Sequence, residues 1–171
     1  MFLRLTALIG VLLLLAACGN RPETEAGGPG GFGGPGGLGG LGVPAGISAS
    51  RFGPGSQQDL AATAGDRIFF AFDSAEITSE AQLVLQRQAA WLKRYPNLAA
   101  TIEGHTDERG TREYNLALGE RRAQAARSVL VALGISPSRL STISYGKERP
   151  AVPDSTEEAY AQNRRAVTVM N

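Results

Sequence analysis

The feature that most constrains this chain is a stretch rich in glycine and proline from Gly19 to Ser56, with GGPGGFGGPGGLGGLG at its centre. Side chains are too few here to build a core, and glycine loses more backbone entropy on ordering than any other residue. We therefore predict a flexible linker in which the isolated Phe32, Leu38 and Leu41 are passive. The folded core must lie in the residues that follow.

The first seventeen residues are typical of a secretory signal, with Arg4 before an apolar run too short to span a bilayer. The residues LAA then precede Cys18, as in the lipobox of bacterial lipoproteins. We expect residues 1–17 to be removed and Cys18 to be acylated. The absence of aspartate after Cys18, where Gly19 stands, resembles lipoproteins that are sorted to an outer membrane. The alternative is an ordinary cleavage near Ala17 that leaves an incidental thiol.

Charge and cysteine content exclude several classes of function. Lysine and arginine together number 17 against 16 acidic residues, so the chain lacks the excess of positive charge that nucleic-acid binding requires. A single cysteine permits neither an internal disulfide nor a zinc site built from thiolates. We expect no cofactor and no metal, and a core that rests on hydrophobic packing alone.

The remainder of the chain predicts a single α/β domain. Residues 1–17 are the predicted signal peptide, 18–57 the lipidated N-terminus and linker, and 58–171 the domain. Strand and helix patterns alternate along the domain, which predicts helices packed on a sheet. The predicted strands cover 66–73, 98–103, 140–145 and 165–170, and the predicted helices run from a cap at Thr78 or Ser79 to Pro96, from a cap at Thr111 to about Leu133, and over 157–163.

Two details of these elements concern packing. In the first strand, Ile68, Phe70 and Phe72 alternate and are expected to share one face. Trp91 lies next to the apolar stripe of the first long helix, where we expect half-buried packing and not a ligand platform.

An arginine lies on the apolar stripe of the second long helix. Leu118, Arg122 and Val129 fall at helical spacing, with Asn115 one turn earlier on the same side. A guanidinium near a core needs an anionic partner, because desolvating an unpaired charge costs several kcal/mol. Asp107, in the turn before this helix, and Asp73 are internal candidates. The pattern leaves open either an internal salt bridge or a pocket that binds a zwitterion.

Three motifs carry a resemblance to a known family: GHTDERGTREYNLALGERRA at 104–123, SYGKERPAV at 144–152 and NRRAV at 163–167. Together they resemble the peptidoglycan-associated lipoproteins of the OmpA-like family, over essentially all of 66–170. The resemblance implies a βαβαβ(α)β sandwich with helices packed on a mixed four-stranded sheet. It further implies noncovalent binding of the diaminopimelate-containing stem peptide of peptidoglycan, without cleavage.

The resemblance also assigns residues and partners. The family's key aspartate falls on Asp107 and its key arginine on Arg122, with a second aspartate on Asp73. An anchor in the outer membrane would join that membrane to the wall within the Tol envelope system, with a TolB-like β-propeller as partner and a role in envelope integrity and cell division. A wall-binding lipoprotein without Tol partners is the alternative. The implied binding residues are Asp73, Thr106, Asp107, Asn115, Leu118 and Arg122.

A third hypothesis is a wall hydrolase that uses His105 and Asp107. The sequence offers neither a nucleophile motif nor a second histidine, so we expect His105 to be structural. Glu108 and Arg109 are expected to hold the turn. The pair that precedes the last strand, Arg164–Arg165, is expected to bind surface acids, with a partner surface as the alternative.

Overall fold

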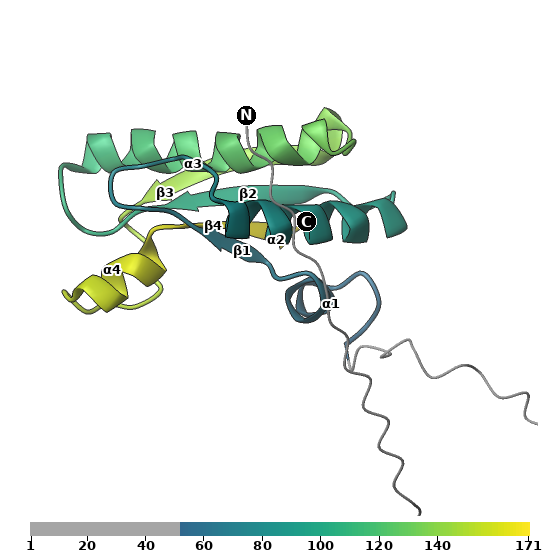
Figure 1. The fold of residues 1–171 in the computed structure, drawn as a ribbon, viewed down its shortest axis with the longest axis horizontal. Coiled ribbons are helices and arrows are strands. Elements are labelled where there is room, and N and C mark those ends of the chain that lie inside the picture. Colours follow the sequence, from purple (N-terminus) through teal and green to yellow (C-terminus); the bar gives the residue numbers. More distant parts are fainter. Residues whose placement is uncertain (1–51) are drawn as a thin grey trace, which may run out of the picture. The chain divides into compact units, whose positions relative to one another are not determined.

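The computed structural model describes residues 52–171. The predicted signal peptide, Cys18 and almost all of the predicted linker lie outside the described residues. Within the described part, none of the helices combines the length and hydropathy that a membrane span requires. The elements are α1 (Gln57–Thr63), β1 (Arg67–Phe69), α2 (Ser79–Arg94), β2 (Ala100–His105), α3 (Arg112–Ala132), the 3₁₀ helix η1 (Pro137–Arg139), β3 (Leu140–Gly146), α4 (Glu157–Asn163) and β4 (Arg165–Met170) (Figure 1).

The strands form one mixed sheet in the order β1-β4-β2-β3. Strands β2 and β3 are parallel, and β4 runs antiparallel to both of its neighbours. This arrangement confirms the expected α/β class with helices on a mixed four-stranded sheet. The three main helices start where a threonine hydroxyl accepts a backbone N–H, at Thr78, Thr111 and Thr156, as N-caps should.

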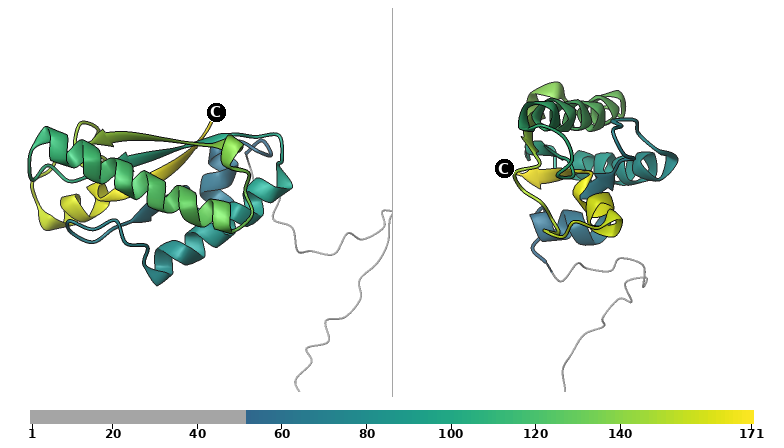
Figure 2. Two further views of the ribbon diagram at one scale, coloured as in Figure 1. Left: turned by 90° about the horizontal axis from the view of Figure 1, so that it is seen from above. Right: turned by 90° about the vertical axis from the view of Figure 1, so that its left-hand side faces the viewer.

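The long helices α2 and α3 pack on the same face of the sheet (Figure 2). Ala100 and Ile102 of β2 point to this face and are fully buried against them. Toward the end of β2, a Cβ atom on Gly104 would lie 1.8 Å from the carbonyl oxygen of Gly119 in α3. Only glycine permits this approach. This close approach of Gly104 to Gly119 brings the first half of α3 into contact with the end of β2, where the candidate site lies.

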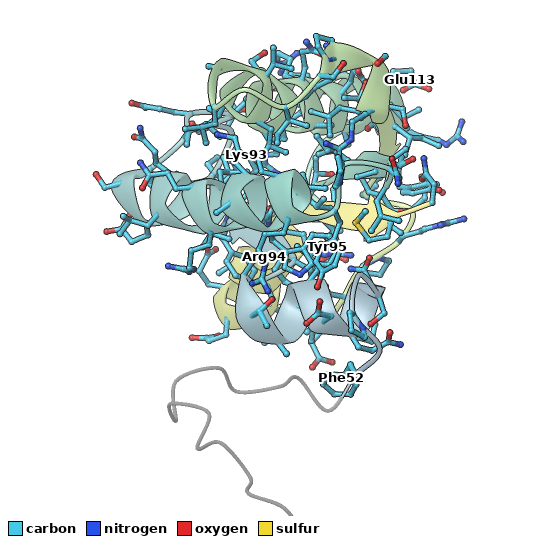
Figure 3. All side chains as sticks on the ribbon, turned by 90° about the vertical axis from the view of Figure 1, so that its right-hand side faces the viewer. Phe52, Lys93, Arg94, Tyr95 and Glu113 are labelled. Carbon is cyan, nitrogen blue, oxygen red and sulfur yellow. The ribbon has the colours of Figure 1, made fainter. Side chains whose placement is uncertain are left out.

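Helix α1, which the sequence did not predict, is attached to the sheet and to α2. Gln57 donates to the carbonyl of Thr168 (3.0 Å) and accepts from the N–H of Met170 (2.9 Å), so its amide pairs with β4 beyond the end of β1. Asp59 accepts from Trp91 Nε1 (3.0 Å) and from the Tyr95 hydroxyl (3.2 Å). Figure 3 shows Tyr95 between α2 and α1.

Two expectations about packing are wrong. The first strand covers only Arg67–Phe69, and not 66–73, because its partner β4 begins at Arg165, opposite Phe69. Phe72 therefore leaves the sheet and is 60% exposed instead of sharing a face with Ile68. Trp91 is 3% exposed and not half-buried, because α1 covers it.

Candidate functional site

A cavity of about 150 Å³ opens where β2 ends and α3 begins. The turn between these two elements forms one wall, and the segment after β1 forms another; the turn lies at the α4 end of the sheet (Figure 1). All six residues that the sequence analysis assigned to binding line this cavity. The full lining is Phe72, Asp73, Thr106, Asp107, Arg109, Gly110, Tyr114, Asn115, Leu118 and Arg122.

Arg122 is fully buried, and backbone carbonyls hold its guanidinium. Nε donates to Ser74 O (2.8 Å), Nη1 to His105 O (2.8 Å) and Nη2 to Ala71 O (3.1 Å). These bonds use three of the five N–H groups of a guanidinium. Burial lowers the pKa of Arg122 to about 10, against the opposing charge of Asp107, so the side chain stays cationic at neutral pH.

No carboxylate within residues 52–171 forms an ion pair with Arg122. The internal salt bridge that the sequence left open, to Asp107 or Asp73, is therefore absent. A cation that is buried against a cavity without an anionic partner is a group that an anionic ligand would compensate. The two remaining N–H groups match a carboxylate in number.

Asp107 is buried and pairs with two other arginines. Its Oδ2 lies 2.6 Å from Arg109 Nη2 and 3.3 Å from Arg164 Nη1, and its Oδ1 accepts from the Arg109 backbone N–H at 3.2 Å. Burial acts to raise the pKa of Asp107, but hydrogen bonds from Arg109 and Arg164 outweigh it and hold that pKa below its ordinary value. Asp107 is thus an anion inside a cationic cluster.

Asp73 lies at the mouth of the cavity and is exposed. It accepts a hydrogen bond from the Tyr114 hydroxyl, which raises the pKa of Tyr114. The backbone of Asp73 is left-handed, with φ of 52°, a conformation that aspartate and asparagine tolerate better than most residues. Among residues 52–171, Asp73 is therefore the acid of this site that forms no ion pair, and its side chain is open to solvent.

Asn115 holds the turn, and Leu118 and Phe72 provide the apolar walls. Asn115 Nδ2 donates to the carbonyls of Arg109 (2.8 Å) and Thr111 (3.0 Å), so its amide group fixes the turn from beneath. Leu118 is 5% exposed. Phe72 lies on the Arg109 guanidinium, 4.2 Å from ring centroid to Cζ. The cavity thus joins charged groups to an aliphatic and an aromatic surface.

Four lining residues were not predicted from the sequence: Phe72, Arg109, Gly110 and Tyr114. Phe72 was assigned to a strand, and the turn role given to Arg109 said nothing of a cavity. Tyr114 carried a usable signal, because it lies one residue before Asn115 and one turn before Leu118 on a helix whose start is polar.

His105 is 2% exposed, and its Nε2 lies 3.4 Å from Glu103 Oε2. Burial, followed by the charge of Arg165, lowers the pKa of His105 to about 4. The imidazole is therefore neutral at physiological pH, and it is not among the residues that line the cavity. Residues 52–171 contain no group of three or more potential metal ligands.

Arg164 and Arg165 are both buried, and among the described residues only Arg164 pairs with a surface acid, so the expectation is confirmed for Arg164 and wrong for Arg165. Arg164 donates to Phe70 O (3.2 Å) and pairs with buried Asp107, while reaching exposed Glu157 at 2.8 Å. Arg165 donates to the carbonyl of Arg149 (3.2 Å). Both arginines lie where the chain passes from α4 to β4, and both guanidiniums donate to backbone carbonyls of other segments.

The fold and the cavity define a class of α/β domain with two helices on one face of a mixed sheet and a small charged pocket at the ends of parallel strands. A family model described as the OmpA family matches residues 69–164. The chain belongs to the OmpA family, on the branch of the peptidoglycan-associated lipoproteins.

The relatives support this branch. The peptidoglycan-associated lipoprotein of Agrobacterium fabrum is 61% identical over 117 residues, which are 68% of this chain and 66% of that protein. The protein of the same description from Brucella melitensis is 55% identical over 126 residues, 74% of this chain and 75% of that one.

Among solved structures, the peptidoglycan-associated lipoprotein from Burkholderia pseudomallei aligns with a TM-score of 0.60 and 43% identity, over 62% of this chain and 90% of that one. The C-terminal domain of Helicobacter pylori MotB aligns with a TM-score of 0.58 and 26% identity, over 62% and 84%. These proteins therefore share the fold of this domain.

Proposed function

We propose that this chain is a noncatalytic outer-membrane lipoprotein that grips the diaminopimelate residue of the peptidoglycan stem peptide. The observation that carries the proposal is the uncompensated Arg122 guanidinium at the cavity wall, with two N–H groups left for a carboxylate. The relatives at 55–61% identity are described as peptidoglycan-associated lipoproteins, which supports peptidoglycan as the target.

The two charged groups at the free end of the ligand would distinguish it from other amino acids. The free end of diaminopimelate bears both a carboxylate and an ammonium. The carboxylate would compensate Arg122, and the ammonium would meet Asp73 at the mouth, with Asp107 adding negative charge behind it. Leu118 and Phe72 would contact the methylene chain between the two ends of the amino acid. A lysine in the same position lacks the carboxylate and would leave Arg122 uncompensated.

The anchor and the partner complete the proposal. Cys18, acylated after cleavage of residues 1–17, would hold the chain in the outer membrane with its domain facing the periplasm, because two or more acyl chains anchor a protein stably. The tether keeps the domain at a high effective concentration near the wall, so a modest affinity suffices. Association with a TolB-like β-propeller would place the protein in a Tol-Pal system that acts in envelope integrity and cell division.

Titration of the chain from residue 18 onward, carrying Cys18→Ser, tests the ligand. We expect a diaminopimelate peptide to bind at least tenfold more tightly than its lysine counterpart. Asp73→Asn removes the charge at the mouth while keeping a residue that tolerates the left-handed backbone. It should weaken diaminopimelate binding about tenfold, since a charge-assisted hydrogen bond contributes roughly 1.5–3 kcal/mol.

The matched control is Glu113→Gln, which removes an exposed carboxylate from the first turn of α3 outside the cavity lining. It should bind as the parent does. Equal affinity for the diaminopimelate and lysine peptides would overturn the proposal.

Two further assays address the alternatives. Incubation with purified peptidoglycan should release no fragments, and turnover that His105→Ala abolishes would establish a hydrolase instead. A pull-down with a TolB homologue separates a Tol-linked protein from a wall-binding lipoprotein without Tol partners.

A further inference from the structure

A second cavity, of about 130 Å³, lies at the same end of the sheet, against the other side of the turn that follows β2. Its polar lining comes from Thr106, Glu108, Lys147, Asp154 and Asn163, and Val152 contributes to its apolar wall. The volume is well above the roughly 10–15 Å³ that a single water needs. Nothing in the proposed grip on the diamino acid uses this space.

Thr106 belongs to the walls of both cavities. The residue is 2% exposed, and its Oγ1 is buried without a hydrogen-bond partner among the described residues. A buried hydroxyl that lacks a partner destabilises a fold by about 1–3 kcal/mol. Its position between the two cavities leaves Oγ1 available to a ligand group that passes there.

The second cavity offers both a donor and an acceptor. Lys147 Nζ donates to the carbonyls of Glu108 (3.1 Å) and Gly110 (2.8 Å), which leaves one of its three N–H groups. Glu108 Oε1 accepts from Ser155 (2.7 Å) and Tyr160 (2.7 Å), which leaves Oε2. An unused N–H beside an unused carboxylate oxygen matches the C=O and N–H of a peptide unit.

Charge argues against an anion in this cavity. Its lining carries two carboxylates, Glu108 and Asp154, against one ammonium, Lys147. An anionic group would face net repulsion. A cationic donor would be attracted by the carboxylates but could not accept the unused N–H of Lys147. A neutral peptide unit meets neither penalty. The apolar wall at Val152 suits a small aliphatic side chain such as a methyl group.

We propose that the second cavity binds the neutral peptide unit that flanks the diamino acid, with Thr106 bonded to the peptide where it passes from one cavity to the other. This inference rests on the proposed function, because the amino acid in the first cavity would belong to a stem peptide. The peptide units next to that amino acid would extend from it on either side. The domain then reads a short stretch of stem peptide and not an isolated amino acid.

The test compares two probes on the chain from residue 18 onward with Cys18→Ser. One probe is free diaminopimelate, which occupies the first cavity alone. The other is diaminopimelate flanked on each side by alanine, with both peptide ends blocked so that the flanking units are neutral. We expect the parent chain to bind the flanked probe at least tenfold more tightly than the free amino acid.

Val152→Phe fills the second cavity and should reduce this preference at least fivefold, with affinity for free diaminopimelate unchanged within twofold. Where that variant does not fold, Val152→Ala gives the same comparison by deleting the apolar contact. Asp154→Lys, at an exposed position on the rim, changes the charge of the cavity by two and should alter the preference less than twofold, because the flanking unit is neutral.

Three results would overturn the inference: equal parent affinities for the two probes, a preference that Val152 variants leave intact, or a preference that collapses in Asp154→Lys. The last would mean that the cavity takes a charged group. Binding of neither probe would instead remove the proposed function itself, and the second cavity would lose its ligand with it.

Discussion

The Oδ2 atom of Asp107 lies 2.6 Å from Nη2 of Arg109, two residues further along the turn. Asp107 is therefore held by a neighbour in its own turn and not by Arg122. Replacing Arg109 with methionine should raise the pKa of Asp107, because the variant loses the hydrogen bonds and the adjacent positive charge that lower this pKa.

Titration of the Asp107 carboxyl by ¹³C NMR measures this shift. Arg121→Met is the matched control, since Arg121 is an exposed arginine on α3 that is absent from the hydrogen bonds to Asp107. A pKa that stays the same in Arg109→Met would contradict the pairing.

Arg122 supports the fold as well as the cavity. Its guanidinium donates to three carbonyls from two separate segments, the one after β1 and the end of β2. Arg122→Ala should lower the free energy of unfolding by about 3 kcal/mol or more, because each buried carbonyl left without a donor costs about 1–3 kcal/mol. Urea denaturation gives this value, and Arg121→Ala should stay within about 0.5 kcal/mol of the parent.

This double role changes how the site is tested. Loss of wall binding in Arg122→Ala would not separate a lost ligand contact from a damaged fold, whereas Asp73→Asn touches the mouth of the cavity alone. An Arg122→Ala variant as stable as the parent would show that the three carbonyl bonds contribute little.

Local sequence patterns predicted most of the fold. Threonine caps at Thr78 and Thr111 and the stop at Gly134, whose φ is 93°, are signals within a few residues of the boundaries they mark. Arg122 was found because helical spacing placed a charge on an apolar stripe. Features of this kind depend on neighbours three or four residues away, which a sequence displays directly.

What the sequence did not predict depends on distant contacts. The end of β1 is set by the first residue of β4, and the burial of Arg164 by the carbonyl of Phe70, 94 residues away. Helix α1 is short, and Gln57 fixes it to Met170, 113 residues away. Short helices are marginal by themselves, so propensity does not reveal them. The partner of Asp107 was missed because spacing along α3 drew attention to Arg122.

Helix α1 should contribute measurably to stability. Leu60 is fully buried in the core, and Leu60→Ala should lower the free energy of unfolding by about 2–5 kcal/mol. Leu83→Ala is the matched control, because Leu83 is 55% exposed on α2 and should change stability by less than about 0.5 kcal/mol. Chemical denaturation of both variants makes the comparison; equal effects would mean that α1 is not part of the cooperative core.

A chain that starts at residue 66 should likewise be less stable than one that starts at residue 52. It lacks both the Leu60 packing and the Gln57 pairing with β4. Thermal unfolding of the two proteins compares them, and identical midpoints would be the contrary result.

His105 should make stability depend on pH in one window. Burial, with the charge of Arg165, lowers the pKa of His105 from 6.5 to about 4 in the folded domain. Between these values the unfolded chain binds a proton that the folded domain does not, so the free energy of unfolding falls as pH falls from 6.5 toward 4. The limiting slope for one proton is about 1.4 kcal/mol per pH unit.

Denaturation at several pH values between 7 and 4, in the parent and in His105→Asn, isolates this contribution. The asparagine variant keeps a polar side chain but cannot titrate, so its slope in the window should be shallower by up to that amount. Carboxyl groups with a lowered pKa, such as Asp107, reduce the free energy of unfolding only at lower pH, as pH falls below their ordinary pKa near 4. They do so in both proteins. Parallel curves for the two proteins above pH 4 would mean that the imidazole has the same pKa in the folded and unfolded states.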